Sequence, residues 1–261
     1  MKPEKLLPGE HGLTVSWITV ILISLFTAND FFITGLILLL LNIMILPGMD
    51  RILYVLKAIF YKRSIHNLFK KKIDYYVFSI VVIGAVTLLI GIRNNAIPLV
   101  SVIIPTIFFF IFLKFFMSRG YRNSYTMRSA IIFVGSIYII INSSLTKSFN
   151  HKEILIFILI MFLEIILVNN VEMIKKQNIA VEWSKEFNIA IFCLLIIMTT
   201  TLYMFMGNIT YMILFFIFYL STFFIYFLIK NRSIRITGIV STIFNIFFIA
   251  IITVLYSPLL K

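Results

Sequence analysis

The sequence predicts an all-α fold, a polytopic transmembrane helical bundle in one integral membrane domain over residues 1–261. Three observations predict it. Of the 261 residues, 61% are hydrophobic and only 13% are charged, which is too little polar surface for a water-soluble domain of this length. Apolar runs long enough to cross a bilayer recur along the whole chain. Basic residues gather between alternate runs.

Nine apolar segments can each cross the hydrocarbon as a helix, which pairs all of its backbone groups internally. We expect these spans at approximately 13–28, 31–47, 75–92, 96–117, 129–145, 154–169, 188–206, 209–229 and 237–258. Only Asn29 and Asp30 separate the first two spans, which predicts a tight helical hairpin, and Gly207-Asn208 predicts the same turn between the seventh and eighth. Eight or ten spans remain compatible with this pattern.

The basic residues predict the orientation of the spans. With the amino terminus in the cytoplasm, only four of the 23 Lys and Arg residues fall outside, namely Arg93, Lys147, Lys152 and Lys261. Cytoplasmic loops carry the excess of Lys and Arg in membrane proteins, so we expect a multi-pass protein of the cell membrane with an external carboxyl terminus. Topology and anionic headgroups then explain the net charge of +13, and nucleic acid is not expected as a partner.

The longest loops, residues 48–74, 118–128 and 170–187, are all predicted to be cytoplasmic, so a site open to water is expected on that side. Segment 49–62 places apolar side chains at helical spacing between Arg51 and Lys62, which is typical of a helix lying in the headgroup region. A second span that continues past a kink at Pro47-Gly48 explains this segment equally well.

Few residues in the sequence can carry chemistry. The single cysteine, Cys193, cannot form an intrachain disulfide. His11, His66 and His151 all fall outside the predicted spans, which disfavours a buried haem and a zinc site. No catalytic motif or glycine-rich phosphate loop stands out. The sequence therefore identifies no cofactor and no metal ion, and it leaves open whether the protein is an enzyme.

Glu164 is the carboxylate that the sequence places deep within a span. An ionisable group in hydrocarbon is costly unless it is paired, hydrated or protonated, so Glu164 is a candidate functional residue. The alternative is a structural role, in which Glu164 lies close enough to the cytoplasmic end to reach water or to pair with Lys175 or Lys176.

Two further sets of polar residues lie at predicted cytoplasmic ends of spans. Glu10 and His11 stand directly before the first span, where they could form a functional polar group or simply begin a helix that has Glu in its first turn. Glu172 lies with Glu182 and Glu186 in or beside the loop after the sixth span, and a solvated, salt-bridged helix face explains these three more simply.

The chain resembles the YwiC-like family of prokaryotic membrane proteins, whose members open with P-x-(Q/E)-H-G directly before the first span, here Pro8 to Gly12. The resemblance in layout continues through Arg63 to Lys72, Arg122-Asn123, Val168 to Lys175 and Arg235 to Gly238. Only the first motif is specific. The resemblance implies a polytopic membrane protein without an assigned activity.

The layout is also similar to that of the UbiA prenyltransferases, which have nine spans, an internal amino terminus and long cytoplasmic loops after spans two and six. Those enzymes hold magnesium and an isoprenoid diphosphate through Asp-rich motifs in these loops. Here Asp50 follows the second span, and Asn169, Asn170 and Glu172 stand where the second motif is expected. So few carboxylates put ordinary diphosphate chemistry in doubt.

The leading hypothesis is a YwiC-like membrane protein of unassigned activity that holds an isoprenoid or quinone-like lipid through a cytoplasmic opening. A UbiA-like prenyltransferase with degenerate motifs is the first alternative. The second is a membrane subunit or assembly partner of an electron-transfer complex, which would add other membrane subunits to the bilayer as partners. A transporter is a weaker alternative, motivated by Pro98 and Pro105 in the fourth span.

Overall fold

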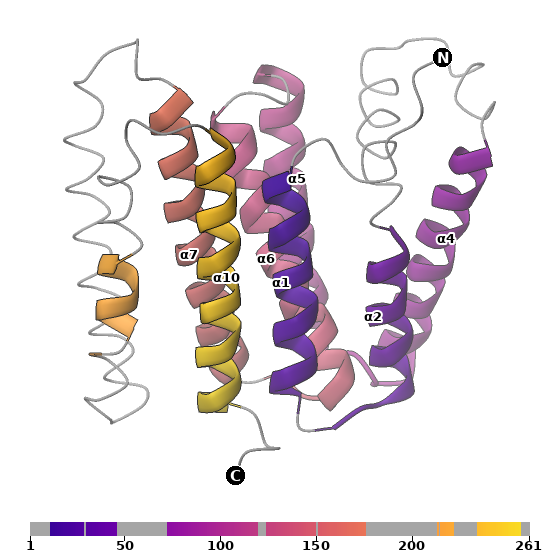
Figure 1. Cartoon of the computed structure of the whole chain (residues 1–261). Helices are drawn as coiled ribbons and strands as arrows, with labels where there is room; N and C mark the ends of the chain where they lie inside the picture. The colour runs from indigo at the N-terminus through magenta and orange to yellow at the C-terminus, as the bar shows by residue number, and fades with distance from the viewer. Residues whose placement is uncertain are drawn as a thin grey trace. The chain divides into compact units, whose positions relative to one another are not determined.

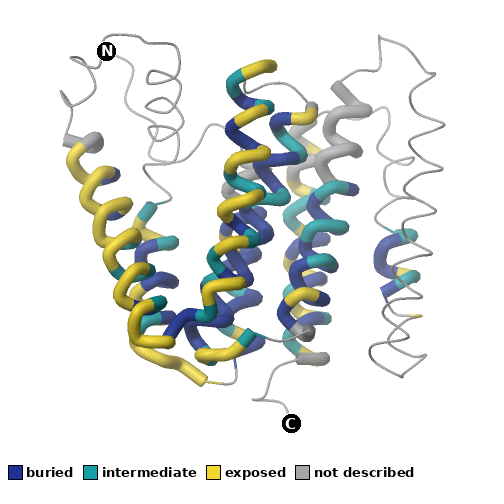
Figure 2. The backbone as a smooth tube through the Cα atoms, turned by 180° about the vertical axis from the view of Figure 1, so that it is seen from behind, coloured by how far each residue is buried: buried dark blue, intermediate teal, exposed yellow. Residues whose placement is uncertain are grey.

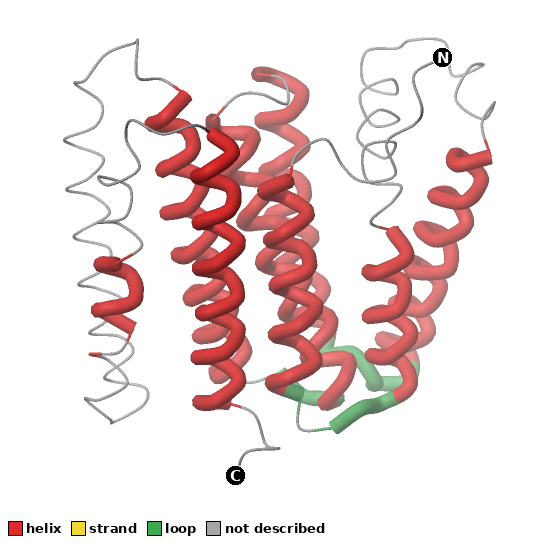
Figure 3. The backbone as a smooth tube through the Cα atoms, viewed as in Figure 1, coloured by secondary structure: helices red, strands yellow, loops and turns green. Residues whose placement is uncertain are grey.

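The computed structural model describes residues 11–28, 30–45, 72–119, 124–149, 151–175, 213, 215–221 and 234–256. Every secondary-structure element in these ranges is helical (Figure 3), which confirms the all-α prediction for them. Three helical stretches, Tyr75–Arg93, Leu99–Arg119 and Tyr125–Thr146, are long and apolar enough to cross a membrane. The chain is therefore a multi-pass membrane protein.

Seven helices have defined bounds, and a further helical stretch covers residues 215–221 (Figure 1). In chain order the seven are α1 (His11–Thr27), α2 (Ile33–Ile45), α4 (Lys72–Arg93), α5 (Leu99–Arg119), α6 (Ser124–Thr146), α7 (His151–Lys175) and α10 (Ile234–Tyr256). They coincide with the first six expected spans and the ninth. The expected span 188–206, the turn at Gly207-Asn208 and the expected surface helix 49–62 lie outside the described residues.

Two helices extend beyond the apolar runs that predict them. α6 begins at Ser124, before the expected start at residue 129, and α7 covers His151–Lys175 instead of 154–169. Hydropathy marks only the part of a helix that lies in hydrocarbon, whereas the backbone hydrogen bonds of a helix continue into its polar flanks. The longer α7 brings Glu153, Asn170 and Glu172 into the helix.

The chain divides into two compact units, residues 1–157 with 246–261, and residues 158–245. In the first unit α6 is the central helix, because α5, α1 and α2 all pack against it, while α4 packs against α2 (Figure 1). The turn between α1 and α2 is short, as expected, yet these two helices touch one another less than each touches α6. Their position is therefore set mainly by a common partner.

The most buried of the three long helices of the first unit is the least apolar one. In its most apolar window α6 is 72% buried, against 28% for α5 and 17% for α4. Figure 2 shows α4, at the left of that view, exposed along most of its length. For a protein in a bilayer, apolar side chains gain little by moving from contact with lipid to contact with another helix. Polar side chains, in contrast, must find partners between helices. A bilayer therefore favours burial of the less apolar helix, which is the reverse of the distribution in a water-soluble protein.

Small residues let α2 approach α6 and α4 closely. A Cβ atom at Gly35 of α2 would lie 2.5 Å from the backbone nitrogen of Leu145 and 2.7 Å from the carbonyl carbon of Ser144, both on α6. A Cβ atom at Gly91 of α4 would lie 3.2 Å from the Cγ2 atom of Thr34 on α2 and would clash with Ile97. Backbone contact of this kind is a usual means of helix association in membranes.

Three chain segments of the first unit meet at one end of its helices. The Phe32 amide, in the turn between α1 and α2, donates to the Leu145 carbonyl of α6 at 3.0 Å. The turn between α4 and α5 lies beside Thr34 at the start of α2, and its Asn95 has a positive φ of 52°, a conformation that Asn tolerates after a helix end. Both turns are drawn in green in Figure 3. Helices that cross the bilayer in alternate directions bring both turns and the end of α6 to the same side.

Replacing Gly35 by Ala should destabilise the protein by about 1–3 kcal/mol, because the new methyl group would overlap the α6 backbone, which cannot move as a side chain can. The matched control is Gly84→Ala on α4, where a Cβ atom would meet only Leu41 Cδ1 at 3.9 Å. That control should leave stability unchanged or slightly raised. Thermal unfolding in one detergent measures both, and an equal effect of the two variants would contradict the packing described.

Candidate functional site

A buried hydrogen-bonded cluster joins the end of α1 to the second half of α6. The hydroxyl oxygen of Thr27 lies 2.7 Å from the Ile23 carbonyl, 3.1 Å from the Tyr138 hydroxyl and 3.4 Å from the Asn142 amide oxygen. Because Thr27 has one proton, which the closer Ile23 carbonyl accepts, Tyr138 donates to Thr27. All three of these polar side chains are buried, so the cluster is sealed between the two helices.

Three buried serines of α6 donate their hydroxyl protons within that helix. Ser136, Ser143 and Ser144 donate to carbonyls one turn earlier, at 2.6, 2.6 and 2.5 Å. Such back-bonding lets a polar residue face a neighbouring helix in hydrocarbon without a partner on it. These three serines therefore serve close packing, whereas Tyr138 and Asn142 of α6 bring polar groups into contact with Thr27 of α1.

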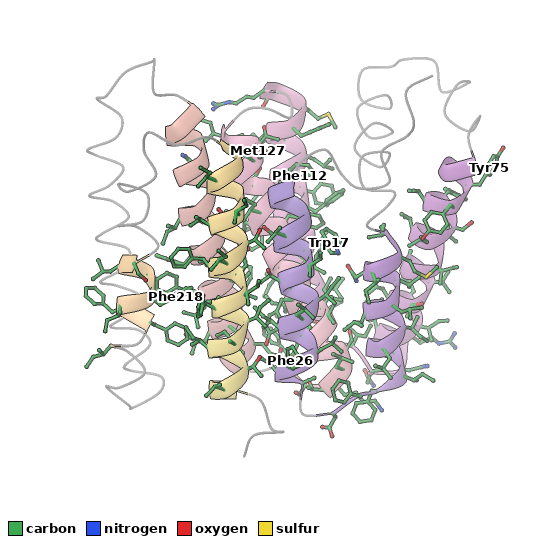
Figure 4. All side chains as sticks on the ribbon, in the orientation of Figure 1. Trp17, Phe26, Tyr75, Phe112, Met127 and Phe218 are labelled. Atoms are coloured by element: carbon green, nitrogen blue, oxygen red, sulfur yellow. The ribbon has the colours of Figure 1, made fainter. Side chains whose placement is uncertain are left out.

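Trp17 links α1 to α2 at the other end of the first unit. Its indole N–H donates to the Asn42 carbonyl at 3.1 Å, and the Asn42 amide donates to the Leu38 carbonyl at 2.8 Å. Figure 4 labels Trp17 on α1. Tyr76 of α4 donates to the Met44 carbonyl at 2.6 Å, which satisfies a carbonyl at the end of α2. These bonds hold α1, α2 and α4 together.

Glu164 lies in the middle of α7 and is only 4% exposed. It stands eleven residues before Lys175 on the same helix, so their Cα atoms are about 16 Å apart, further than the two side chains can span. Lys176, the other partner that the sequence offers, lies outside the described residues, so the alternative of a structural role stays a prediction. A buried carboxylate within an apolar helix remains the functional candidate.

Glu153 is a second buried carboxylate, which the sequence reading missed. It lies in the first turn of α7 and is 2% exposed. Glu153 follows the polar residues His151 and Lys152, so the sequence assigns it to the loop before the expected span, which begins at residue 154. An acidic residue just before an apolar run is a helix-start signal, because the first turn of a helix favours negative charge. That signal identifies the helix start, although it does not predict the burial.

Aromatic side chains of the second unit pack on one face of α7. The Tyr219 hydroxyl donates to the Leu159 carbonyl at 2.9 Å, and its ring lies edge-on to Phe162 at 6.0 Å between centroids. Phe218, labelled in Figure 4, contacts Tyr219 and Phe244 in the same edge-on manner. At about 100° per residue, Glu164 lies roughly 140–160° around the helix from Leu159 and Phe162. Glu164 therefore belongs to a different face.

The remaining predicted site residues are not brought together by the described structure. Glu10 and Asp50 lie outside the described residues. His11 is the first residue of α1, and Asn170 and Glu172 belong to the last turns of α7, but the described side chains do not include these three. Among the described residues, no group of three or more His, Cys, Asp or Glu could hold a metal ion.

Comparison with models of known protein families, with curated proteins and with solved structures found no match for this chain. What is established is a helical membrane protein with buried polar residues on α1, α6 and α7.

The bond between Thr27 and Tyr138 should show energetic coupling. Thr27→Val and Tyr138→Phe each remove one hydroxyl without changing side-chain volume much, and each should cost about 0.5–1.5 kcal/mol. The double variant should cost clearly less than the sum, because both changes remove the same bond. Ser136→Ala, which removes a bond within α6 alone, is the control and should have little effect. Strict additivity in thermal unfolding would refute the bond.

Proposed function

We propose that this protein is a nine-span membrane protein of the YwiC-like type that binds an isoprenoid or quinone-like lipid between its helices. Its amino terminus lies in the cytoplasm and its carboxyl terminus outside the cell. The observation that carries the ligand proposal is the buried carboxyl group of Glu164 at the middle of α7. The resemblance at Pro8 to Gly12 supports the family.

The orientation is supported by the charges at the two ends of the first unit. Arg93 and Lys147 lie at the end where the turn between α4 and α5 meets the end of α6. Lys114, Arg119 and Arg128 lie at the opposite end, where α5 finishes and α6 begins. The end that is richer in basic residues is the cytoplasmic one by the positive-inside rule, and the alternation along the rest of the sequence agrees.

Glu164 is suited to recognising the head of a lipid-soluble molecule. A carboxyl group buried in hydrocarbon is reached from the bilayer by lipid-soluble molecules, and it can form a hydrogen bond with the oxygen atoms of such a ligand. When protonated, a carboxyl group both donates and accepts, which matches the carbonyl or hydroxyl head of a quinone or isoprenoid. The apolar tail of such a ligand needs only the apolar surroundings that α7 provides.

The aromatic residues on the other face of α7 are not the ligand site. Phe162, Phe218 and Tyr219 pack edge-on against one another, and Tyr219 is bonded to the α7 backbone. These rings are already packed against one another, so they hold α7 against the helical stretch of residues 215–221. The ligand is therefore expected on the face that carries Glu164.

Replacing Glu164 by Leu should reduce the amount of isoprenoid or quinone-like lipid that copurifies in mild detergent by about tenfold, because the ligand head loses a buried hydrogen-bonding partner. Mass spectrometry of the retained lipids measures this. The matched control is Glu153→Leu, the same substitution on the same helix at another buried carboxylate, which should retain the lipid.

Three results would count against this proposal. The wild-type protein could retain no enriched isoprenoid or quinone-like lipid, which would remove the ligand. Equal losses in the Glu164 and Glu153 variants would show that burial of charge, and not ligand contact, is at work. Magnesium-dependent prenyl transfer that is lost in both Asp50→Ala and Glu172→Ala would instead establish the UbiA-like prenyltransferase.

A further inference from the structure

The turn between α1 and α2 is fixed to the last turn of α6. The Phe32 amide donates to the Leu145 carbonyl at 3.0 Å, and the Lys147 ammonium lies 3.8 Å from the centroid of the Phe32 ring. A Cβ atom at Gly35 would overlap the backbone of Leu145. These three contacts join the turn and the start of α2 to the end of one helix, so the depth of the turn in the membrane follows from the depth of that helix.

The end of α6 lies at the edge of the hydrocarbon. The span Tyr125–Thr146 has 22 residues and is therefore about 33 Å long, only slightly longer than the hydrocarbon thickness of about 30 Å. Leu145 is the penultimate residue of this span. Consecutive Cα atoms are about 3.8 Å apart, so the segment from Phe31 to Ile33 stays close to the level of Leu145 and cannot extend far beyond this edge.

A second helix gives the turn the same depth. A Cβ atom at Gly91 would lie 3.2 Å from the Cγ2 atom of Thr34, and Gly91 stands two residues before the end of the span Tyr75–Arg93. This span has 19 residues and is about 28 Å long, which matches the hydrocarbon thickness. Thr34 is thus level with the last turn of α4, as Phe32 is with that of α6. Figure 4 labels Phe26 near the end of α1 that leads into the turn.

Three consecutive apolar side chains of the turn face outward. Phe31 is 48% exposed, Phe32 36% and Ile33 74%. Leu36 and Leu40 of α2 are also exposed, and they follow Ile33 at helical spacing, so they continue its apolar surface along that helix. Large apolar side chains gain free energy by leaving water. At the depth of this turn, the groups that can cover them are the acyl chains and glycerol groups of lipids.

Charged side chains lie directly beside these apolar residues. Asp30 precedes Phe31 and is exposed, and Lys147 is exposed with its ammonium group over the Phe32 ring. A lysine of this kind covers apolar surface with its aliphatic part and keeps its ammonium group among headgroups or water. Aromatic, aliphatic and charged groups within one short turn match the interfacial layer of a bilayer, which is apolar on one side and hydrated on the other.

We propose that the turn between α1 and α2 is an interfacial anchor, a surface that binds the layer of glycerol groups and headgroups of the bilayer. Phe31 and Ile33 insert among the upper parts of the acyl chains, and Lys147 holds Phe32 and places its own ammonium group among the headgroups. The anchor sets the depth of α1 and α2 in the membrane. This surface is separate from the ligand site at Glu164 and does not depend on that ligand.

Depth-dependent fluorescence quenching tests the proposal. Phe31→Cys in a Cys193→Ala background of the full chain would carry a bimane label in phosphatidylcholine vesicles. Lipids brominated near the carboxyl end of an acyl chain should remove most of its fluorescence, and aqueous iodide should remove little. The matched control is a label at Leu40→Cys, an exposed position two turns into α2. That label should be quenched best by lipids brominated further along the acyl chain.

The proposal is overturned if iodide quenches the label at residue 31 more than the brominated lipids do, because the turn would then stand in water. It is also overturned if neither iodide nor lipid quenches this label, because protein would then cover the turn. Should Phe31→Cys fail to fold, Ile33→Cys at the neighbouring exposed position must give the shallow lipid quenching instead. Iodide quenching at that position would overturn the proposal in the same way.

Discussion

The need to pair polar groups in hydrocarbon organises the first unit of this protein. α6 carries hydroxyl and amide side chains along most of its length and is the helix on which α1, α2 and α5 pack. Its serines bond back to its own carbonyls, whereas Tyr138 meets Thr27 on α1. In lipid, such bonds and close backbone contact replace the hydrophobic effect that drives helices together in water. Apolar α4 can therefore remain on the outside.

The same constraint sets the chemistry expected at the proposed ligand site. Glu164 is buried in the middle of α7, an apolar helix. A ligand that reaches it from the bilayer must itself be lipid-soluble, and its oxygen atoms would meet the carboxyl group away from bulk water.

The sequence predicted where helices lie better than how they pair. Apolar runs locate α1, α2, α4 and α5 closely, because their polar flanks are short, but α6 and α7 extend into polar flanks that hydropathy does not see. Glu164 can be recognised in the sequence because it is a charged residue within an apolar run. Glu153 cannot, because polar residues precede it. The hydrogen bond between Thr27 and Tyr138 joins residues 111 positions apart. A local pattern in one sequence cannot predict a contact between residues so far apart.

Accessibility of spin labels in lipid bilayers tests the central claim, that α4 faces hydrocarbon while α6 is shielded. Single cysteines at Val82 and Leu89 of α4, and at Ser136 and Ser143 of α6, would be labelled in a Cys193→Ala background. We predict strong relaxation by oxygen and weak relaxation by a water-soluble nickel chelate at the α4 positions, and weak relaxation by both at the α6 positions. Strong relaxation by the nickel chelate along α4 would contradict the account.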